Sequence, residues 1–157
     1  MVCTGNICRS PTAEGVLRDK ARAAGVSIEV DSCGTHDYHI GEPPDRRSQA
    51  HARRRGYDLS AQRARQFEAR DYARFDLIFA MDSRNLAQLQ ARCPAEHRHK
   101  LQRLLAYSTL DRDGDVPDPY YDGDAGFERV LDLIEDAADQ LLHRLKTSDE
   151  MPRSSLS

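Results

Sequence analysis

Residues 3–11 read Cys3-Thr4-Gly5-Asn6-Ile7-Cys8-Arg9-Ser10-Pro11. Pro11 suits the first turn of a helix, so the residues before it are expected to wrap the N-terminus of that helix. Gly5 and Asn6 tolerate left-handed backbone, which lets successive N–H groups converge on one point. Such a nest at a helix N-terminus binds phosphate-like dianions, and Arg9 adds a fork that matches two phosphoryl oxygens. The stretch therefore predicts a phosphate-binding loop.

Cys3 stands at the base of this predicted positive field, which favours the thiolate and makes the residue a candidate nucleophile. A cysteine near a strand end is more often a small buried side chain, and a cysteine five residues before an arginine is common by chance. The Gly-Asn pair inside the loop, the Ser-Pro pair after Arg9 and the amphipathic pattern beyond favour the catalytic interpretation.

Length and composition restrict the class of protein. A chain of 157 residues is typical of one domain, and 23 basic against 26 acidic residues give a net charge of −3. This balance favours neither nucleic acid nor an anionic membrane as a partner, and the arginine clusters at 46–47 and 53–55 are interpreted as a solvated helix face. The sequence has no apolar run long enough to span a membrane and no signal-peptide pattern, and its four cysteines lack the spacing of a disulfide framework. We therefore expect a cytoplasmic protein without membrane insertion.

Hydrophobic periodicity predicts alternating strands and helices. Apolar residues at helical spacing follow the loop as far as Gly25, and residues 26–30 alternate as in a half-buried strand. The continuous apolar run at 77–81 is typical of a strand buried on both faces. We also expect a short strand over residues 101–105. Three further helices are expected, over residues 45–55, over residues 127–145, and from a cap at Ser83 to about Arg92. This order predicts an α/β fold, with a parallel sheet and helices on both faces.

The two ends of the chain carry separate expectations. Only Met1 and Val2 precede the loop, whereas a central strand usually needs about five residues. We therefore expect the natural chain to begin several apolar residues upstream, or to have been shortened here. At the other end apolar residues become rare, so residues 1–146 are expected to form the domain and residues 147–157 a disordered tail.

A second segment, residues 111–122, is dense in candidate acids. Because a leaving alkoxide or phenolate needs a proton, a phosphoryl-transfer site is expected to present an acid on a facing loop. Asp118 is the best candidate, since Pro117 and Pro119 stiffen its loop. An exposed acidic turn would have a similar composition. A calcium loop matches poorly, because its glycine would fall at Val116 and its glutamate at Asp122.

Residues 3–11 together with Asp118-Pro119-Tyr120-Tyr121 resemble the low-molecular-weight protein tyrosine phosphatase family. The likeness extends through residues 31–35, 64–66 and 80–82, and it covers residues 1 to about 146. It implies a single-domain, flavodoxin-like, three-layer fold with about four parallel strands. It also implies hydrolysis of phosphotyrosine and aryl phosphates through a phosphocysteine intermediate. The chain departs from the family in its short first strand and at Cys33, where the family usually has alanine and where we expect only packing to change.

The resemblance assigns roles to individual residues. It implies that Cys3 is the nucleophile, that Ser10 donates to its thiolate, and that Asp118 acts first as acid and then as base. Asn6 would brace the loop, and neither a metal nor another cofactor would be required. The phosphoryl group would be held by Thr4, Gly5, Asn6, Ile7, Cys8 and Arg9.

Specificity is expected to reside in the rim of the pocket. Tyr38, Tyr120 and Tyr121 are candidate walls of a slot deep enough for phosphotyrosine, although each could be an ordinary aromatic residue. Related protein-arginine phosphatases carry threonine at the position of Ile7, so isoleucine there favours phosphotyrosine. Cys8 either packs beneath the loop or, as the resemblance implies, forms a reversible disulfide with Cys3.

Three other functions are compatible with parts of this pattern. Cys33 and Cys93 are expected to be structural, and Cys93 has no neighbouring cysteine, which argues against a thioredoxin-linked arsenate reductase. A protein-arginine phosphatase remains an alternative. A silent phosphotyrosine-binding module is disfavoured because Cys3 and Asp118 are both present.

The expected partners are phosphotyrosine proteins, among them an autophosphorylating tyrosine kinase, and the expected state is a monomer.

Overall fold

The computed structural model describes residues 1–147. Its sheet has four parallel strands, β1 (Val2–Cys3), β2 (Cys33–Gly34), β3 (Ile78–Ala80) and β4 (Leu101–Arg103), in the order β2-β1-β3-β4. In the central register Val2 pairs with both Cys33 and Ala80. The chain passes from β1 to β2 on one side of it and then crosses to β3 on the other side. The carboxyl end of β1 is therefore the switch point, where ligands bind in such sheets. The predicted parallel α/β sheet is confirmed.

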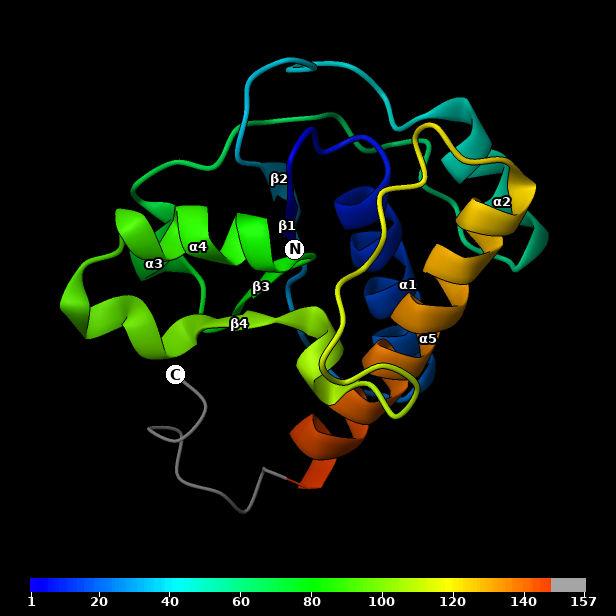
Figure 1. The fold of residues 1–157 in the computed structure, drawn as a ribbon. Coiled ribbons are helices and arrows are strands. Elements are labelled where there is room, and N and C mark those ends of the chain that lie inside the picture. The colour runs from blue at the N-terminus through cyan, green and yellow to red at the C-terminus, as the bar shows by residue number, and fades with distance from the viewer. Residues whose placement is uncertain (148–157) are drawn as a thin grey trace.

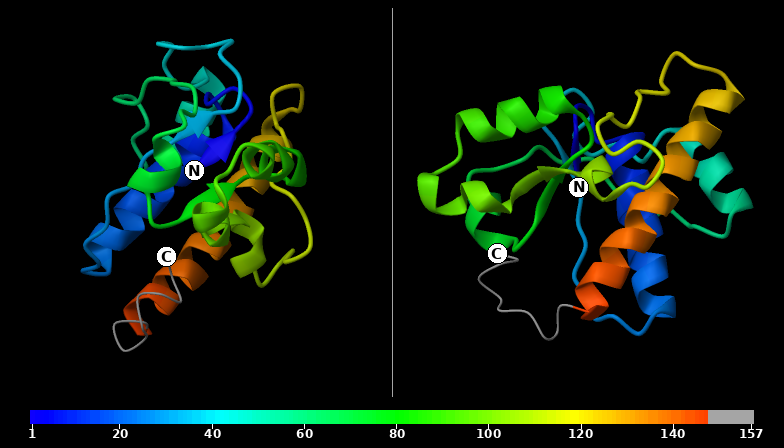
Figure 2. Two further views of the ribbon diagram at one scale, coloured as in Figure 1. Left: turned by 90° about the vertical axis from the view of Figure 1, so that its left-hand side faces the viewer. Right: turned by 60° about the horizontal axis from the view of Figure 1, so that its bottom comes forward.

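Helices cover both faces of this sheet (Figures 1 and 2). One face carries α1 (Arg9–Ala23), α2 (Arg46–Arg54) and α5 (Asp124–Thr147), while α3 (Asp71–Arg74) and α4 (Ser83–Ala91) lie on the other. Two 3₁₀ helices, η1 (Ala95–Lys100) and η2 (Leu104–Tyr107), flank β4. Two hydrophobic cores follow from this layering, one on each side of the sheet. The expected three-layer fold is therefore observed.

The long helix α5 illustrates why these segments are helical. Its apolar residues recur every three or four positions, so they share one face, and that face packs against α1 and η2. The buried members of this face are Phe127, Val130, Leu131, Leu133, Ile134, Ala137, Ala138, Leu141 and Leu142. At about 1.5–3 kcal/mol for each large apolar side chain, their burial is the main stabilisation of the helix.

The prediction of a strand over residues 26–30 is wrong. A strand needs a hydrogen-bonded neighbour, and β1 pairs only through Val2 and Cys3, so only Cys33 and Gly34 have a partner on that side. Residues 27–30 instead border a cavity of about 470 Å³ at the amino end of β1. The cavity is lined largely by apolar side chains, including Leu17, Phe67, Leu77, Phe79 and Leu141.

Three smaller expectations about element ends are also corrected. Helix α4 is capped by Asp82 rather than Ser83, since the Asp82 carboxylate accepts from the N–H of Asn85 at 2.7 Å. Strand β4 ends at Arg103, and Leu104 begins η2. Helix α5 continues through Thr147, one residue into the expected tail; the rest of that tail, residues 148–157, lies outside the described residues.

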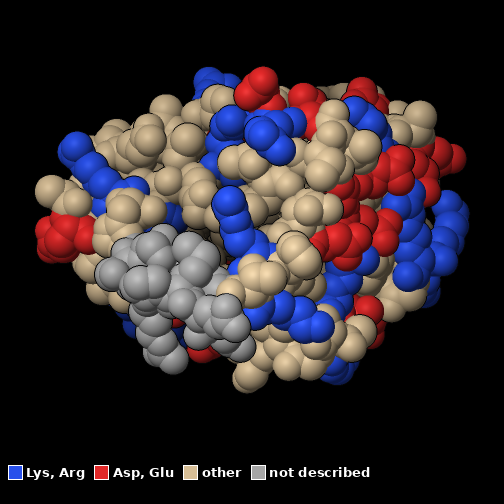
Figure 3. All heavy atoms as spheres, turned by 90° about the horizontal axis from the view of Figure 1, so that it is seen from below, with Lys and Arg blue, Asp and Glu red and all other residues tan. Residues whose placement is uncertain are grey.

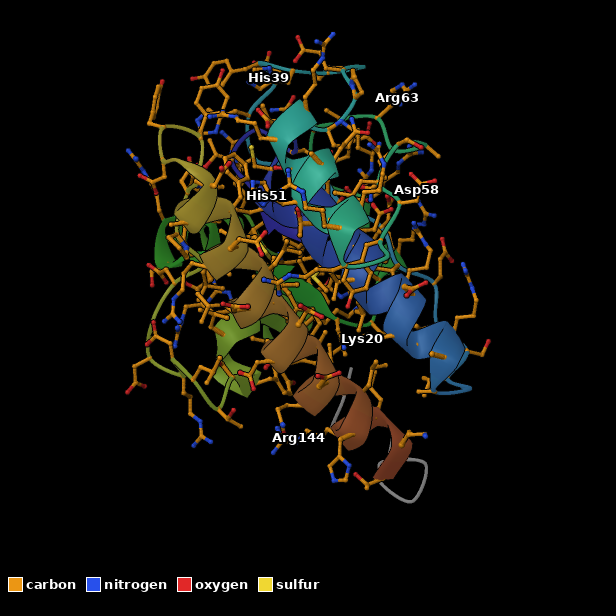
Figure 4. The ribbon with its side chains drawn as sticks, turned by 90° about the vertical axis from the view of Figure 1, so that its right-hand side faces the viewer. Lys20, His39, His51, Asp58, Arg63 and Arg144 are labelled. Carbon is orange, nitrogen blue, oxygen red and sulfur yellow. The ribbon has the colours of Figure 1, made fainter. Side chains whose placement is uncertain are left out.

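Charged side chains of both signs are mixed on the face that Figure 3 shows. The arginine cluster at 53–55 is only partly the solvated face that was expected, because Arg55 forms ion pairs with Glu128, Asp132 and Glu135 of α5. In Figure 4, His51 on α2 and Lys20 on α1 both lie beside α5, and Lys20 forms an ion pair with Asp139 of α5 at 2.9 Å. Among residues 1–147, no helix has the length and hydropathy of a membrane span.

Candidate active site

The loop from Thr4 to Cys8 connects β1 to α1 at the carboxyl edge of the sheet. In Figure 1 it meets the segment after β2 and the segment before α5 at the top of the molecule. Asn6 has φ of 59°, the left-handed conformation expected for it, whereas Gly5 lies outside that region. A Cβ at Gly5 would lie 3.1 Å from Cδ2 of His39, a tight contact with the end of a side chain. The prediction of left-handed backbone is therefore confirmed for Asn6 and wrong for Gly5.

Cys3 is buried at the end of β1, and its sulfur has two polar neighbours. The hydroxyl of Ser10 lies 2.9 Å from Sγ, and the backbone N–H of Asn6 donates to Sγ at 3.2 Å. The Ser10 Oγ already accepts a hydrogen bond from Nδ2 of Asn6 at 2.8 Å. Its own proton is then free to point at the sulfur, since the other acceptor in reach, the Cys33 carbonyl, is farther away at 3.4 Å.

The side chain of Asn6 is fixed at both ends. Its Nδ2 also donates to Ser32 at 3.0 Å, and its Oδ1 accepts from the backbone N–H of Arg65 at 3.0 Å. The bracing role expected of Asn6 is thus visible as contacts to three segments of the chain. Gly34 completes the support, because a Cβ there would lie 2.6 Å from the carbonyl oxygen of Thr4.

Arg65 is held in turn by two carboxylates that the sequence interpretation did not single out. Its guanidinium lies 3.1 Å from Asp31 and 2.9 Å from Asp71, whose side chain is almost fully buried. Asp71 also accepts from the N–H of Glu68 at 2.8 Å. The ion pairs therefore fix the backbone that supports Asn6 in the phosphate loop.

Arg9 is buried and points across the site. Its NH1 donates to Asp82 at 2.6 Å and to the Val116 carbonyl at 3.2 Å, while its NH2 lies 3.9 Å from Oδ2 of Asp118. Burial works against the cation, but the nearby Cys3 and the hydrogen bond to Asp82 raise the pKa of Arg9 above its ordinary value. The guanidinium is therefore charged at any physiological pH and oriented before a ligand arrives.

Asp118 reaches this site from the loop between η2 and α5. The side chain is about half exposed, at 57%. Oδ1 accepts from the backbone N–H of Tyr120 at 3.1 Å, which leaves Oδ2 directed to the side of Arg9. The two regions singled out in the sequence, the phosphate loop and the acidic segment, therefore form one site.

The three candidate rim tyrosines are all exposed, Tyr38 at 70%, Tyr120 at 38% and Tyr121 at 93%. Tyr38 stacks on His36, with ring centroids 5.0 Å apart, and Tyr120 contacts the edge of Tyr121 at 4.9 Å. The backbone of His36 donates to the Thr4 carbonyl at 3.1 Å, which ties the Tyr38 loop to the phosphate loop. Their role as walls for a substrate stays a prediction.

Comparison with known proteins identifies the family. The family model described as "Low molecular weight phosphotyrosine protein phosphatase" matches residues 1–151. The low molecular weight protein-tyrosine-phosphatase YfkJ of Bacillus subtilis is 40% identical over 152 residues, which cover 96% of each chain. The chain belongs to the low molecular weight phosphotyrosine protein phosphatase family.

Solved structures of this phosphatase family share the fold. The protein tyrosine phosphatase of Entamoeba histolytica with Hepes in its active site superposes with a TM-score of 0.90 at 38% identity, covering 94% of this chain and 96% of that one. A Drosophila arginine phosphatase superposes with a TM-score of 0.85 at 31% identity, covering 92% and 95%. The resemblance seen in the sequence and the expected fold are confirmed.

Cys8 of this phosphatase is a buried thiol with a strongly perturbed pKa. Burial raises the pKa of Cys8 from 9.0 to about 12, and a hydrogen bond with Ser48 offsets part of that rise. The Cys8 side chain is therefore a neutral thiol at physiological pH. Burial likewise raises the pKa of Cys33 to about 12, in keeping with the structural role expected of Cys33.

Sequence reasoning missed several residues that build the site. Asp82 orients Arg9 and caps α4, and Ser32 and Arg65 hold Asn6. The only signal for them was that residues 31–35, 64–66 and 80–82 took part in the resemblance, without any role attached to them. Their contacts depend on which loops meet at one edge of the sheet, which local patterns do not reveal.

Proposed function

We propose that this phosphatase hydrolyses phosphotyrosine in proteins, and aryl phosphates, through a covalent phosphocysteine on Cys3. The observation that carries the proposal is the position of the Cys3 sulfur. It lies beside the Ser10 hydroxyl and the Asn6 N–H, in a loop whose Arg9 faces Asp118. A nucleophile, a cation and an acid therefore converge on one small region.

In the first step, the Cys3 sulfur attacks phosphorus and the bond to the tyrosine oxygen breaks. Asp118, entering as the carboxylic acid, gives its proton to the departing oxygen so that phenol leaves rather than phenolate. Oδ2 is the oxygen suited to carry this proton, since Oδ1 is engaged by Tyr120. The N–H groups from Thr4 to Arg9 and the Arg9 guanidinium hold the three phosphoryl oxygens as charge develops.

In the second step, water attacks the phosphocysteine and the sulfur–phosphorus bond breaks. Asp118, now a carboxylate, accepts the proton from water, and inorganic phosphate is released. The Ser10 hydroxyl, 2.9 Å from Sγ, donates to the departing thiolate. Cys3, Asp118 and the attacking water supply the protons and electron pairs of both steps, so we expect chelators to leave activity unchanged.

The half-buried Ile7 and the exposed rim tyrosines support phosphotyrosine as the substrate. A tyrosine phosphate is longer than a serine phosphate, so Tyr38, Tyr120 and Tyr121 can contact its ring while the phosphate reaches the loop. The structural likeness to an arginine phosphatase makes phosphoarginine the second candidate. Isoleucine rather than threonine at position 7 argues against it.

The setting we propose is the cytoplasm, with a phosphotyrosine protein such as an autophosphorylating tyrosine kinase as partner and the chain acting as a monomer. All four cysteines are free thiols, as a reducing compartment requires.

We also propose that Cys8 forms a reversible disulfide with Cys3 when Cys3 is oxidised. The support for this is the burial of Cys8 in the same loop, five residues after Cys3.

Two variants test the proposed function. Cys3→Ser should abolish hydrolysis of phosphotyrosine peptides while inorganic phosphate still binds, measured by calorimetry. Asp118→Ala should lower kcat/KM by about 10²–10⁴-fold for phenyl phosphate, whose leaving group needs a proton, and far less for 2,4-dinitrophenyl phosphate. Residual turnover by Cys3→Ser, or an Asp118→Ala enzyme with unchanged rates on phenyl phosphate, would overturn it.

A further inference from the structure

Both backbone polar groups of Tyr120 are hydrogen bonded, and each bond leads to a charged side chain. Its N–H donates to Oδ1 of Asp118 at 3.1 Å. Its carbonyl accepts from NH2 of Arg47 at 2.7 Å, which is short for a nitrogen–oxygen hydrogen bond. One peptide segment therefore joins the Arg47 guanidinium to the carboxylate of Asp118.

The Arg47 guanidinium is held by contacts with two aromatic rings. It lies in the first turn of α2, with its guanidinium carbon 4.8 Å from the ring centroid of Phe127 and 5.5 Å from that of Tyr120. Phe127 is buried, and its ring also stacks against that of His51. His51 lies one turn further along α2 (Figure 4). Contact with two aromatic rings restricts the orientation of a planar guanidinium, which favours one direction for its hydrogen bond.

The start of α2 is also attached to the phosphate loop. The N–H of Asp45 donates to the Ile7 carbonyl at 2.8 Å, and the Asp45 carboxylate caps α2 by accepting from the N–H groups of Arg47 and Ser48. The Asp45 side chain also lies 3.4 Å from the Arg47 guanidinium. Arg47 therefore connects the acid loop to the same backbone that holds the phosphate.

We propose that Arg47 is a positioning residue for Asp118, which it holds against the phosphate loop through the backbone of Tyr120. The inference rests on the proposed function, in which Asp118 is the general acid. Proton transfer needs the acid within hydrogen-bond reach of the leaving oxygen, and displacement by about 1 Å can cost up to 10²-fold in rate. The Asp118 side chain is half exposed, and it is held by a hydrogen bond from Tyr120 and an ion pair with Arg9.

The test compares Arg47→Ala with Arg46→Ala, its neighbour on α2. Both arginines are exposed, and among residues 1–147 the Arg46 side chain forms no hydrogen bond or ion pair, so the two variants are matched in charge and position. Two small aryl phosphates are compared, so that contacts between the substrate ring and the rim tyrosines are present in both measurements. Arg47→Ala should lower kcat/KM for phenyl phosphate by about 10- to 100-fold and leave that for 2,4-dinitrophenyl phosphate within about twofold. Arg46→Ala should change neither.

The same change in an Asp118→Ala background separates positioning from a general structural role. There Arg47→Ala should have no further effect on kcat/KM, because the acid that it positions is gone. Arg47→Lys keeps the charge but not the planar stacking, and it should recover only part of the loss. An equal fall for both leaving groups, or an undiminished fall in the Asp118→Ala background, would refute the inference. If Asp118→Ala itself showed no leaving-group dependence, the proposed acid would be at fault instead.

Discussion

At the scale of single residues, the site depends on polar atoms with few alternative partners. Asn6 occupies left-handed backbone and bonds Ser10, Ser32 and the backbone of Arg65 at once, so the hydroxyl of Ser10 has one good acceptor left, the Cys3 sulfur. The sequence predicted Asn6 and Ser10 for these roles. It could not predict Arg65, because its peptide N–H carries no side-chain signature.

A prediction at this scale concerns Cys8. Peroxide should convert the Cys3 thiolate to a sulfenic acid, which the Cys8 sulfur then attacks, forming a disulfide and releasing water. Because the pKa of Cys8 is raised to about 12 by burial, its reactive thiolate is scarce at neutral pH, and disulfide formation should accelerate as pH rises. Mass spectrometry of the peroxide-treated protein measures this rate.

The control is Cys93→Ser, which removes a thiol on the opposite side of the sheet. Dithiothreitol should restore activity nearly fully to the parent and to Cys93→Ser, but less completely to Cys8→Ser, whose Cys3 is exposed to further oxidation. Equal recovery in Cys8→Ser and the parent would show that Cys8 only packs beneath the loop.

At the scale of elements, segments far apart in the sequence position one another at the carboxyl edge of the sheet. Asp82 joins the end of β3 to the start of α4 and to Arg9, and residues 64–66 run beside β2, where Gln66 bridges to Gly34. Helices α1, α2, α4 and α5 and strand β3 were predictable because their apolar patterns are local, whereas the four-residue helix α3 was not predicted. Strand β2 was not, because its extent depends on the length of β1.

The Asp71–Arg65 ion pair provides a prediction at this scale. Asp71→Asn keeps the shape but removes the charge that holds Arg65, so the free energy of unfolding should fall by about 1–3 kcal/mol. The phosphate loop should loosen with it, because Arg65 supports Asn6. Urea unfolding measures the first effect, and kcat with an aryl phosphate measures the second.

The matched control is Asp113→Asn, at an exposed aspartate on the acidic segment. It should be within about 0.5 kcal/mol of the parent, as surface changes usually are. If Asp71→Asn were as stable and as active as Asp113→Asn, the ion pairs would have no part in holding the loop.

At the scale of the whole molecule, the central strand determines where the chemistry can occur. The phosphate loop leaves the carboxyl end of β1, and the doubly wound order brings the acidic loop before α5 to the same end. Alternating periodicity was enough to predict the parallel sheet, and that in turn predicted the edge used by the site. Which loops touch there, as Arg47 touches Tyr120, follows only from the packing of α2 against α5.

The proposed mechanism requires Cys3 to form a covalent bond to phosphorus during turnover. Rapid quenching of the enzyme with a phosphotyrosine peptide, followed by mass spectrometry of its proteolytic fragments, tests it most directly. We expect a phosphoryl group on Cys3 that is absent in Cys3→Ser. With 2,4-dinitrophenyl phosphate it should accumulate further in Asp118→Ala, because no base activates water there. Turnover without phosphorylated Cys3 at any quench time, or with the group on another residue, would contradict it.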